Sequence, residues 1–322
     1  MRRKLAVILF AALVAAPGAS AYGWPVAPFD VEHPVRGNFG DPRTVFRHGV
    51  LDDQGLGGNG AFSFHNGIDI SAAPGTPVYP VESGVTKNVT QSYVVVRSAG
   101  GIFQYQHVAP ILVENRRVIA RRTVLGYVQG PAAHVHLTEI RGGRPVNPLT
   151  LGRLTPYRDT TKPRVAELVF RDPQGRRLAP RQVAGPVSVA AVAHDVPSLP
   201  VPGSWNGLPV TPALVSWSLT SLSGRRPVPE TTVVDFRYGL PLNRDFWRVY
   251  ARGTYQNKPR FGNVQYMSAP GRYEFVVAPA LDTRRLADDV YALRVKVEDV
   301  RGNRGWATET FAVCNAEPGS CS

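Results

Sequence analysis

The sequence has few cysteines and no run of like charges that resembles a nucleic-acid-binding arm. Its two cysteines, Cys314 and Cys321, are too few for a disulfide scaffold, and in an exported chain we expect them to close a small C-terminal loop. The formal charge of +13 comes from basic residues spread along the chain, so we expect no nucleic-acid partner. A diffuse positive surface suits an anionic polymer of the cell envelope instead.

Only the N-terminus carries a long apolar run. Residues 5–16 follow the basic segment Arg2-Arg3-Lys4 and precede Ala19-Ser20-Ala21, which has the small-x-small form of a signal-peptidase site. We therefore expect a signal peptide over residues 1–21 and a secreted protein associated with the cell wall, either periplasmic or extracellular. No later segment is apolar enough to span a membrane, so we expect no transmembrane segment in the mature chain.

Few stretches of the sequence without glycine or proline are long enough to form a helix. The chain contains 31 glycines and 29 prolines, and short β-branched or aromatic runs alternate with turn residues, which predicts a mainly β protein. In the first half of the chain, the predicted strands are residues 69–71, 77–81, 94–97, 102–107, 123–127 and 134–140.

A segment of turn formers separates two patterns. Residues 155–163 predict a linker between a first domain of residues 22–154 and a second domain of residues 164–322. In the second domain, short strands bounded by turns predict a β-sandwich of immunoglobulin-like type. The strands with the clearest signals are residues 187–194, 215–219, 291–298 and 306–313.

The second domain contains no convincing catalytic cluster. Its aromatic side chains could bind a glycan or protein partner, but we expect most of them in the core, because Trp217 and Trp306 lie in alternating strands. The tryptophans of this domain are Trp205, Trp217, Trp247 and Trp306.

Four of the seven histidines fall in three short stretches of the first domain. In a strand, His134 and His136 project to the same face, about 6–7 Å apart. Asn66-Gly67 can bend the chain so that His65 and Asp69 converge on one ion. Two histidines and one carboxylate leave a fourth position open for water, as in a catalytic zinc site. Spacing alone leaves open which histidine of the His134/His136 pair is the ligand.

These stretches and their flanks resemble the lysostaphin/LytM-type zinc metallopeptidases. The likeness covers roughly residues 33–149, with every motif in the expected order. The segments that carry it are residues 34–43, 65–70, 73–78 and 84–85, then Tyr105-Gln106-His107, His134-Val135-His136 and residues 144–148.

The resemblance implies a compact antiparallel β-sheet fold like the duplicated hybrid motif, with one Zn²⁺ in a groove. It implies His65, Asp69 and His136 as the metal ligands. It also implies that His107 and His134 act on the water and on the tetrahedral intermediate. The other histidines, among them His33, His48 and His194, are expected to be structural.

The expected function is secreted zinc-dependent endopeptidase activity on the peptide bonds of peptidoglycan, with zinc-bound water as the nucleophile. No Glu stands beside the ligands as in the His-Glu-x-x-His zincins, so a neutral histidine is the expected general base. His107 and His134 could each take that role. Two other hypotheses are a non-catalytic envelope scaffold or binding protein with the same fold, and a peptidase for soluble proteins or peptides.

The glycine-rich loop over residues 47–63 leads directly into His65. It is either a wall of the groove or an ordinary surface loop. Asn38 or Asn59 could occupy the open metal position in a latent form of the enzyme.

Overall fold

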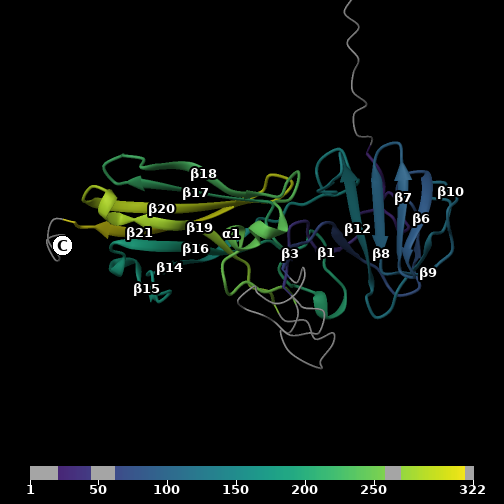
Figure 1. Cartoon of the computed structure of the whole chain (residues 1–322), viewed down its shortest axis with the longest axis horizontal. Helices are drawn as coiled ribbons and strands as arrows, with labels where there is room; N and C mark the ends of the chain where they lie inside the picture. Colours follow the sequence, from purple (N-terminus) through teal and green to yellow (C-terminus); the bar gives the residue numbers. More distant parts are fainter. Residues whose placement is uncertain (1–20, 45–61, 258–269, 316–322) are drawn as a thin grey trace, which may run out of the picture.

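The computed structural model describes residues 21–44, 62–257 and 270–315. The described chain is built from antiparallel sheets with one short α-helix and four 3₁₀ turns, which confirms the expectation of a mainly β protein. Among the described residues, no helix is long and apolar enough to cross a membrane. Two groups of sheets lie along the long axis of the molecule (Figure 1), and we call them the first and second parts.

An eight-stranded antiparallel sheet forms the first part. Its strands in spatial order are β1 (Val35–Gly37), β4 (Ile68–Ser71), β12 (His134–Arg141), β8 (Ile102–Gln106), β7 (Tyr93–Ser98), β6 (Gly84–Thr90) and β10 (Arg117–Val118), and β13 (Arg144–Val146) pairs with β12. The smaller sheets are β5 (Pro77–Val78), β11 (Gly126–Val128) and β9 (Val108–Ile111), and the pair β2 (Pro42–Arg43) and β3 (Ser63–Phe64).

Alternation along the central strands separates a core face from an open face. In β8, Phe103 and Tyr105 are fully buried, while Gln104 and Gln106 lie on the opposite face and are only partly buried. The same period places the side chains of His134 and His136 together on one face of β12. The open face of this sheet therefore collects the polar side chains that the sequence singled out.

Two four-stranded sheets form the second part and pack against each other through one apolar cluster. The first contains β15 (Arg177–Leu178), β14 (Arg164–Arg171), β16 (Pro186–His194) and β19 (Glu274–Asp282), and the second contains β18 (Val228–Asp235), β17 (Leu214–Ser221), β20 (Asp289–Glu298) and β21 (Arg304–Val313). The helical pieces are α1 (Phe246–Val249), η1 (Pro180–Gln182), η2 (Gly203–Trp205), η3 (Asn243–Asp245) and η4 (Thr283–Arg285).

The four strands predicted in this part are present, whereas β14, β15, β18 and β19 were not predicted. The expectation that Trp306 is a core residue is wrong. It is 58% exposed on the edge strand β21, with the Arg294 guanidinium 5.0 Å from its ring centroid.

Cys314 is in a disulfide, and the chain's other cysteine, Cys321, lies outside the described residues.

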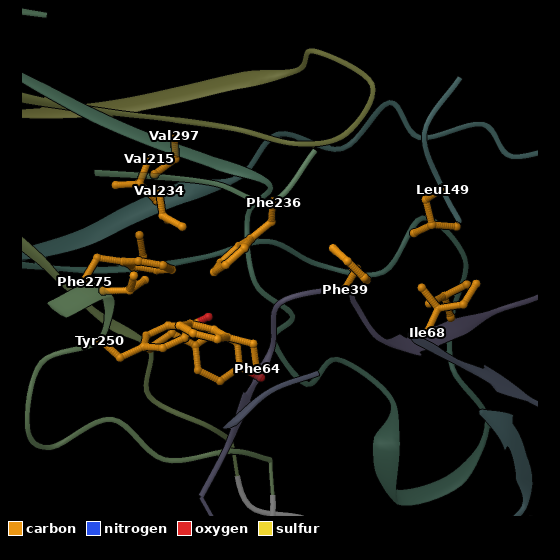
Figure 2. Close-up of a cluster of buried hydrophobic side chains, with 14 of the residues drawn as sticks. Phe39, Phe64, Ile68, Leu149, Val215, Val234, Phe236, Tyr250, Phe275 and Val297 are labelled. Carbon is orange, nitrogen blue, oxygen red and sulfur yellow. The ribbon is translucent and has the colours of Figure 1, made fainter. Parts of the chain in front are cut away.

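Aromatic side chains join the two parts into a continuous core (Figure 2). The ring of Phe64 lies 5.6 Å from that of Phe236 and 5.9 Å from that of Tyr250. Gly40 has a φ of 94°, and a Cβ there would lie 2.6 Å from the Phe236 ring, so only glycine permits this approach. Tyr250 Oη donates to Gly40 O at 2.8 Å, which fixes the same contact.

The connecting segment is held by both parts. Trp24 Nε1 donates to Pro156 O at 2.8 Å, and the Tyr157 side chain is buried. On the other side, Asn303 Nδ2 donates to Asp159 O at 2.9 Å. The first and second parts are thus fixed relative to each other through the segment as well as through the aromatic core.

Candidate functional site

An open groove of about 1620 Å³ runs along the open face of the first sheet. The first part contributes all five of the predicted site side chains, and the second part contributes a facing wall. From the first part the lining includes Arg36, Arg43, His65, Asp69, His107, His134 and His136, and from the second part it includes Trp205, Tyr238, Leu240, Leu242, Asn243, Asn257 and Tyr273.

Three of these side chains converge within 4.8 Å of one another, and we call His65, Asp69 and His136 the groove cluster. His65 Nε2 lies 2.8 Å from His136 Nδ1 and 3.2 Å from Asp69 Oδ1, and His136 Nδ1 lies 3.0 Å from Asp69 Oδ1. Metal bonds of about 2.0–2.1 Å in a tetrahedron require donor atoms roughly 3.3 Å apart. The three donors therefore fit such an ion after shifts of a few tenths of an ångström.

Strand register and two glycines bring the groove cluster together. His136 on β12 is directly opposite Asp69 on β4. A Cβ on Gly67 would lie 2.4 Å from Leu137 O and 2.9 Å from His136 Nε2, and a Cβ on Gly37 would lie 2.7 Å from Asp69 Oδ2. Any larger residue at either position would push the donors apart. The bend expected at Asn66-Gly67 is thus present, and it depends on the absence of a side chain.

Each side chain of the groove cluster is oriented by a hydrogen bond to a residue outside the cluster. His65 Nδ1 donates to Asn38 O at 2.8 Å, which leaves the Nε2 lone pair free for a metal. His136 Nε2 lies 2.8 Å from Thr138 Oγ1, which leaves Nδ1 free. Arg43 Nη2 donates to Asp69 Oδ2 at 2.8 Å, so Oδ1 points to the cluster. Burial, reinforced by Arg43, lowers the pKa of His65 to about 3, so its ring is neutral, as a ligand must be.

The second pair of histidines stands beside the groove cluster. The His107 and His134 ring centroids are 4.4 Å apart, and His134 Nε2 lies 3.4 Å from Asp69 Oδ1. His107 follows β8 with a φ of 63°, and its carbonyl accepts from Gln129 N at 2.8 Å. Burial and the neighbouring His134 lower the pKa of His107 to about 4. At neutral pH this imidazole is therefore uncharged and able to accept a proton.

Arg36 is a site residue that sequence reasoning did not single out. Its Nη2 lies 2.5 Å from His134 Nδ1 and donates to Ala132 O at 2.7 Å. Its guanidinium carbon lies 4.2 Å from the centroid of the Trp205 ring in the second part. No motif could have signalled this contact, because the two residues belong to different parts of the fold.

The idea of a latent form receives no support from Asn38. Its amide Nδ2 donates to Thr211 O at 3.3 Å, toward the second part, and its backbone oxygen accepts from His65. Asn59, His48 and residues 47–61 of the glycine-rich loop lie outside the described residues. His33 Nε2 donates to Pro28 O at 3.0 Å, and His194 ends β16 in the second part, so neither lines the groove.

A second group of close donors lies away from the groove. Asp159, Asp195 and Asp299 are all buried, and their carboxylate oxygens also lie within 4.8 Å of one another. They meet where the connecting segment contacts the second part, and we call them the junction cluster. Burial, with the neighbouring Asp159, raises the pKa of Asp195 to about 8.

Comparison with known proteins places the groove cluster in a family. Residues 63–148 match the model of peptidase family M23. No curated protein sequence matches the chain. Among solved structures, the chain is similar to the catalytic domain of the prophage-encoded M23 protein EnpA from Enterococcus faecalis, with 25% identity over 42% of this chain and 99% of that one, and a TM-score of 0.28.

Another similar structure is that of the M23 metalloprotease pseudoalterin, described as from the deep sea. It is 15% identical over 51% of this chain and 95% of that one, with a TM-score of 0.27.

Proposed function

Because residues 63–148 form a metallopeptidase domain of peptidase family M23, we propose that this protein is a secreted zinc-dependent endopeptidase that hydrolyses peptide bonds in peptidoglycan. The observation that carries the proposal is the meeting of two different histidine pairs at one open groove. His65 and His136 supply metal donors with Asp69, and His107 and His134 stand beside them without that role. A non-catalytic fold has no need of the second pair.

The residues present fit a single Zn²⁺ held by His65 Nε2, Asp69 Oδ1 and His136 Nδ1. When bound, the ion supplies a Lewis acid and an acidified water. His107 and His134 share the proton transfers, one accepting a proton from the attacking water and one donating a hydrogen bond to the scissile carbonyl oxygen. The low pKa of His107, about 4, keeps it in the accepting form.

The substrate class follows from the groove and the charge of the chain. The groove is open, with a volume of about 1620 Å³, and its wall from the second part carries exposed apolar side chains at Tyr238 and Leu242. Residues 1–21 carry three basic residues and no acidic one, so the secreted chain keeps a net charge of +10, which favours approach to an anionic envelope. In this proposal the second part is an immunoglobulin-like β-sandwich that completes the groove and meets the wall polymer.

The test is release of peptide fragments from purified peptidoglycan by the chain without residues 1–21. We expect activity that is lost on chelation and restored by Zn²⁺. His107→Ala and His134→Ala should retain zinc and lose turnover by about 10²–10⁴-fold. His33→Ala is the matched control, because His33 lies outside the groove, and it should leave both zinc and turnover unchanged.

Other outcomes favour the competing hypotheses. Binding to peptidoglycan without release of any fragment would support a non-catalytic envelope protein. Cleavage of soluble peptides with no release from the wall would support a general peptidase. Loss of zinc from His107→Ala or His134→Ala would contradict the roles given to that pair.

A further inference from the structure

The Arg36 side chain joins three segments that are distant in sequence. It starts from β1, passes the Trp205 ring of η2 in the second part, and ends at His134 on β12. The distances are 4.2 Å from its guanidinium carbon to the Trp205 ring centroid and 2.5 Å from Nη2 to His134 Nδ1. Arg36 thus links the second part to His134 through a single residue, as Asn38 links Thr211 of the second part to His65.

The hydrogen bonds of Arg36 Nη2 favour one position for the proton on the His134 ring. A guanidinium offers donors only, and Nη2 has two hydrogens for two neighbours, Ala132 O at 2.7 Å and His134 Nδ1 at 2.5 Å. A proton on His134 Nδ1 would place two donors against each other at that distance. His134 Nδ1 also lies 2.8 Å from Ala132 O, which can only accept, but its shorter contact is to the cationic donor Arg36. With Arg36 in place Nδ1 is therefore the acceptor, and the ring carries its proton on Nε2, the atom that lies 3.4 Å from Asp69 Oδ1 at the groove.

Arg36 is held in this position without an ion pair. Its Nε is buried and has no hydrogen-bond partner among the described residues. Its guanidinium forms no ion pair in the described chain, and the Asp69 carboxylate attracts it only from a greater distance. The flat face against Trp205 supplies a cation–π contact in a desolvated setting. Trp205 therefore limits the guanidinium to the orientation in which Nη2 reaches His134.

We propose that Arg36, held by Trp205, is a positioning residue that makes His134 the hydrogen-bond donor of the site and leaves His107 as its base. The proposal rests on the peptidase function proposed above. A water oxygen forms a bond to the carbonyl carbon and gives a proton to His107. His134 Nε2–H stabilises the resulting oxyanion. The C–N bond then breaks, and the leaving nitrogen takes the proton from His107.

The direct test is nitrogen NMR of the zinc-loaded protein with labelled histidine. In the wild type we expect His134 to carry its proton on Nε2. In Arg36→Met, which keeps the length of the side chain but has no donor, we expect the proton to move to Nδ1, where it donates to Ala132 O. A wild-type His134 protonated on Nδ1 would overturn the proposal, whether or not the protein proves to be a peptidase.

Kinetics provide the second readout. Arg36→Met should lower kcat by about 10–100-fold with KM and zinc content unchanged, as expected for loss of an orienting partner. Arg36→Lys should recover part of kcat, because an ammonium can still donate to Nδ1. Trp205→Ala, which leaves Arg36 in place, should give a smaller fall. Arg97→Met on the exposed side of β7 is the control and should change neither kcat nor the NMR signal.

Unchanged kcat in Arg36→Met would overturn the positioning role, and so would loss of zinc from that variant. Should the wild type release no fragments from any substrate, the peptidase function fails by itself, while the NMR comparison still decides whether Arg36 sets the proton on His134.

Discussion

Two groups of three close donors occur in the described part of this molecule, and they differ in chemistry. In each, the donor atoms lie within 4.8 Å of one another. The groove cluster combines two imidazoles with one carboxylate and lines the open groove, whereas the junction cluster combines three buried carboxylates away from it. Close donors therefore do not by themselves define a metal centre.

The number of carboxylates in each cluster determines whether it favours a bound cation or protonated side chains. With one carboxylate, a divalent ion in the groove cluster keeps a charge of about +1, which is what acidifies bound water. Three carboxylates in the junction cluster cannot all ionise at low cost, and burial raises the pKa of Asp195 to about 8 and also raises that of Asp299. The first cluster suits a cation, and the second holds protons.

The largest expected effect separates the two clusters by metal content. Asp69→Ala removes the only charged donor of the groove cluster, so zinc affinity and turnover should both fall by more than the roughly 10–100-fold that loss of an outer partner costs. Asp195→Asn changes one carboxyl group of the junction cluster and should leave both unchanged. Zinc analysis and fragment release measure the two, and zinc retained by Asp69→Ala would contradict the ligand assignment.

The free energy of unfolding, measured with and without zinc, provides a second way to distinguish the groove cluster from the junction cluster. Binding to the native state alone should raise the free energy of unfolding by about 2.7 kcal/mol at a zinc concentration 100 times Kd. Urea unfolding with and without zinc should show this gain in the wild type and in Asp195→Asn, and no gain in Asp69→Ala. An equal gain in Asp69→Ala would indicate that zinc binds elsewhere.

Orientation of the donors gives a smaller effect. Thr138 Oγ1 is the only partner of His136 Nε2 in the described chain, at 2.8 Å. Thr138→Val keeps the shape and removes the hydroxyl, so zinc affinity should fall by about 10–100-fold. A zinc titration against a competing chelator measures the change. Thr86→Val, also buried but on β6 away from the groove, is the control and should bind zinc as the wild type does.

The groove cluster was accessible from sequence, because strand alternation and the turn at Asn66-Gly67 are local features. His134 and His136 share a face by the period of the strand, and Asp69 reaches them through pairing of neighbouring strands. The choice of His136 rather than His134 as the metal ligand came from the resemblance to the metallopeptidase family. Spacing could not decide it, because both side chains project from the same face of the strand. Their roles remain predictions.

Contacts between the two parts were not accessible in this way. Arg36 and Trp205 meet because the aromatic core fixes one part against the other, and no local pattern encodes that approach. The junction cluster was missed for the same reason. The error on Trp306 was avoidable, because Trp306 shares its face of β21 with the exposed Thr308 and Thr310, whereas the buried Phe311 and Val313 lie on the other face.

The last expected effect is a change in the pH dependence of the free energy of unfolding, and it involves the junction cluster alone. The pKa of Asp195 is raised by burial to about 8 from an ordinary value of 3.8. Below pH 4 both the native and the unfolded chain hold this proton. As the pH rises from 4 to 8 the unfolded chain releases the proton and the native chain keeps it, so stability falls by up to about 1.4 kcal/mol per pH unit.

Asp195→Asn is neutral at every pH, and its amide oxygen can still accept from Val196 N, as Oδ1 does at 2.9 Å. Urea unfolding of the metal-free protein at pH 5, 6 and 7 should therefore give a shallower decline for this variant than for the wild type. Asp288→Asn, an exposed carboxylate in the same part, should follow the wild-type curve. Parallel curves for the wild type and Asp195→Asn would show that Asp195 ionises freely in the native state, and the contrast between a cation-binding cluster and a proton-holding cluster would then be lost.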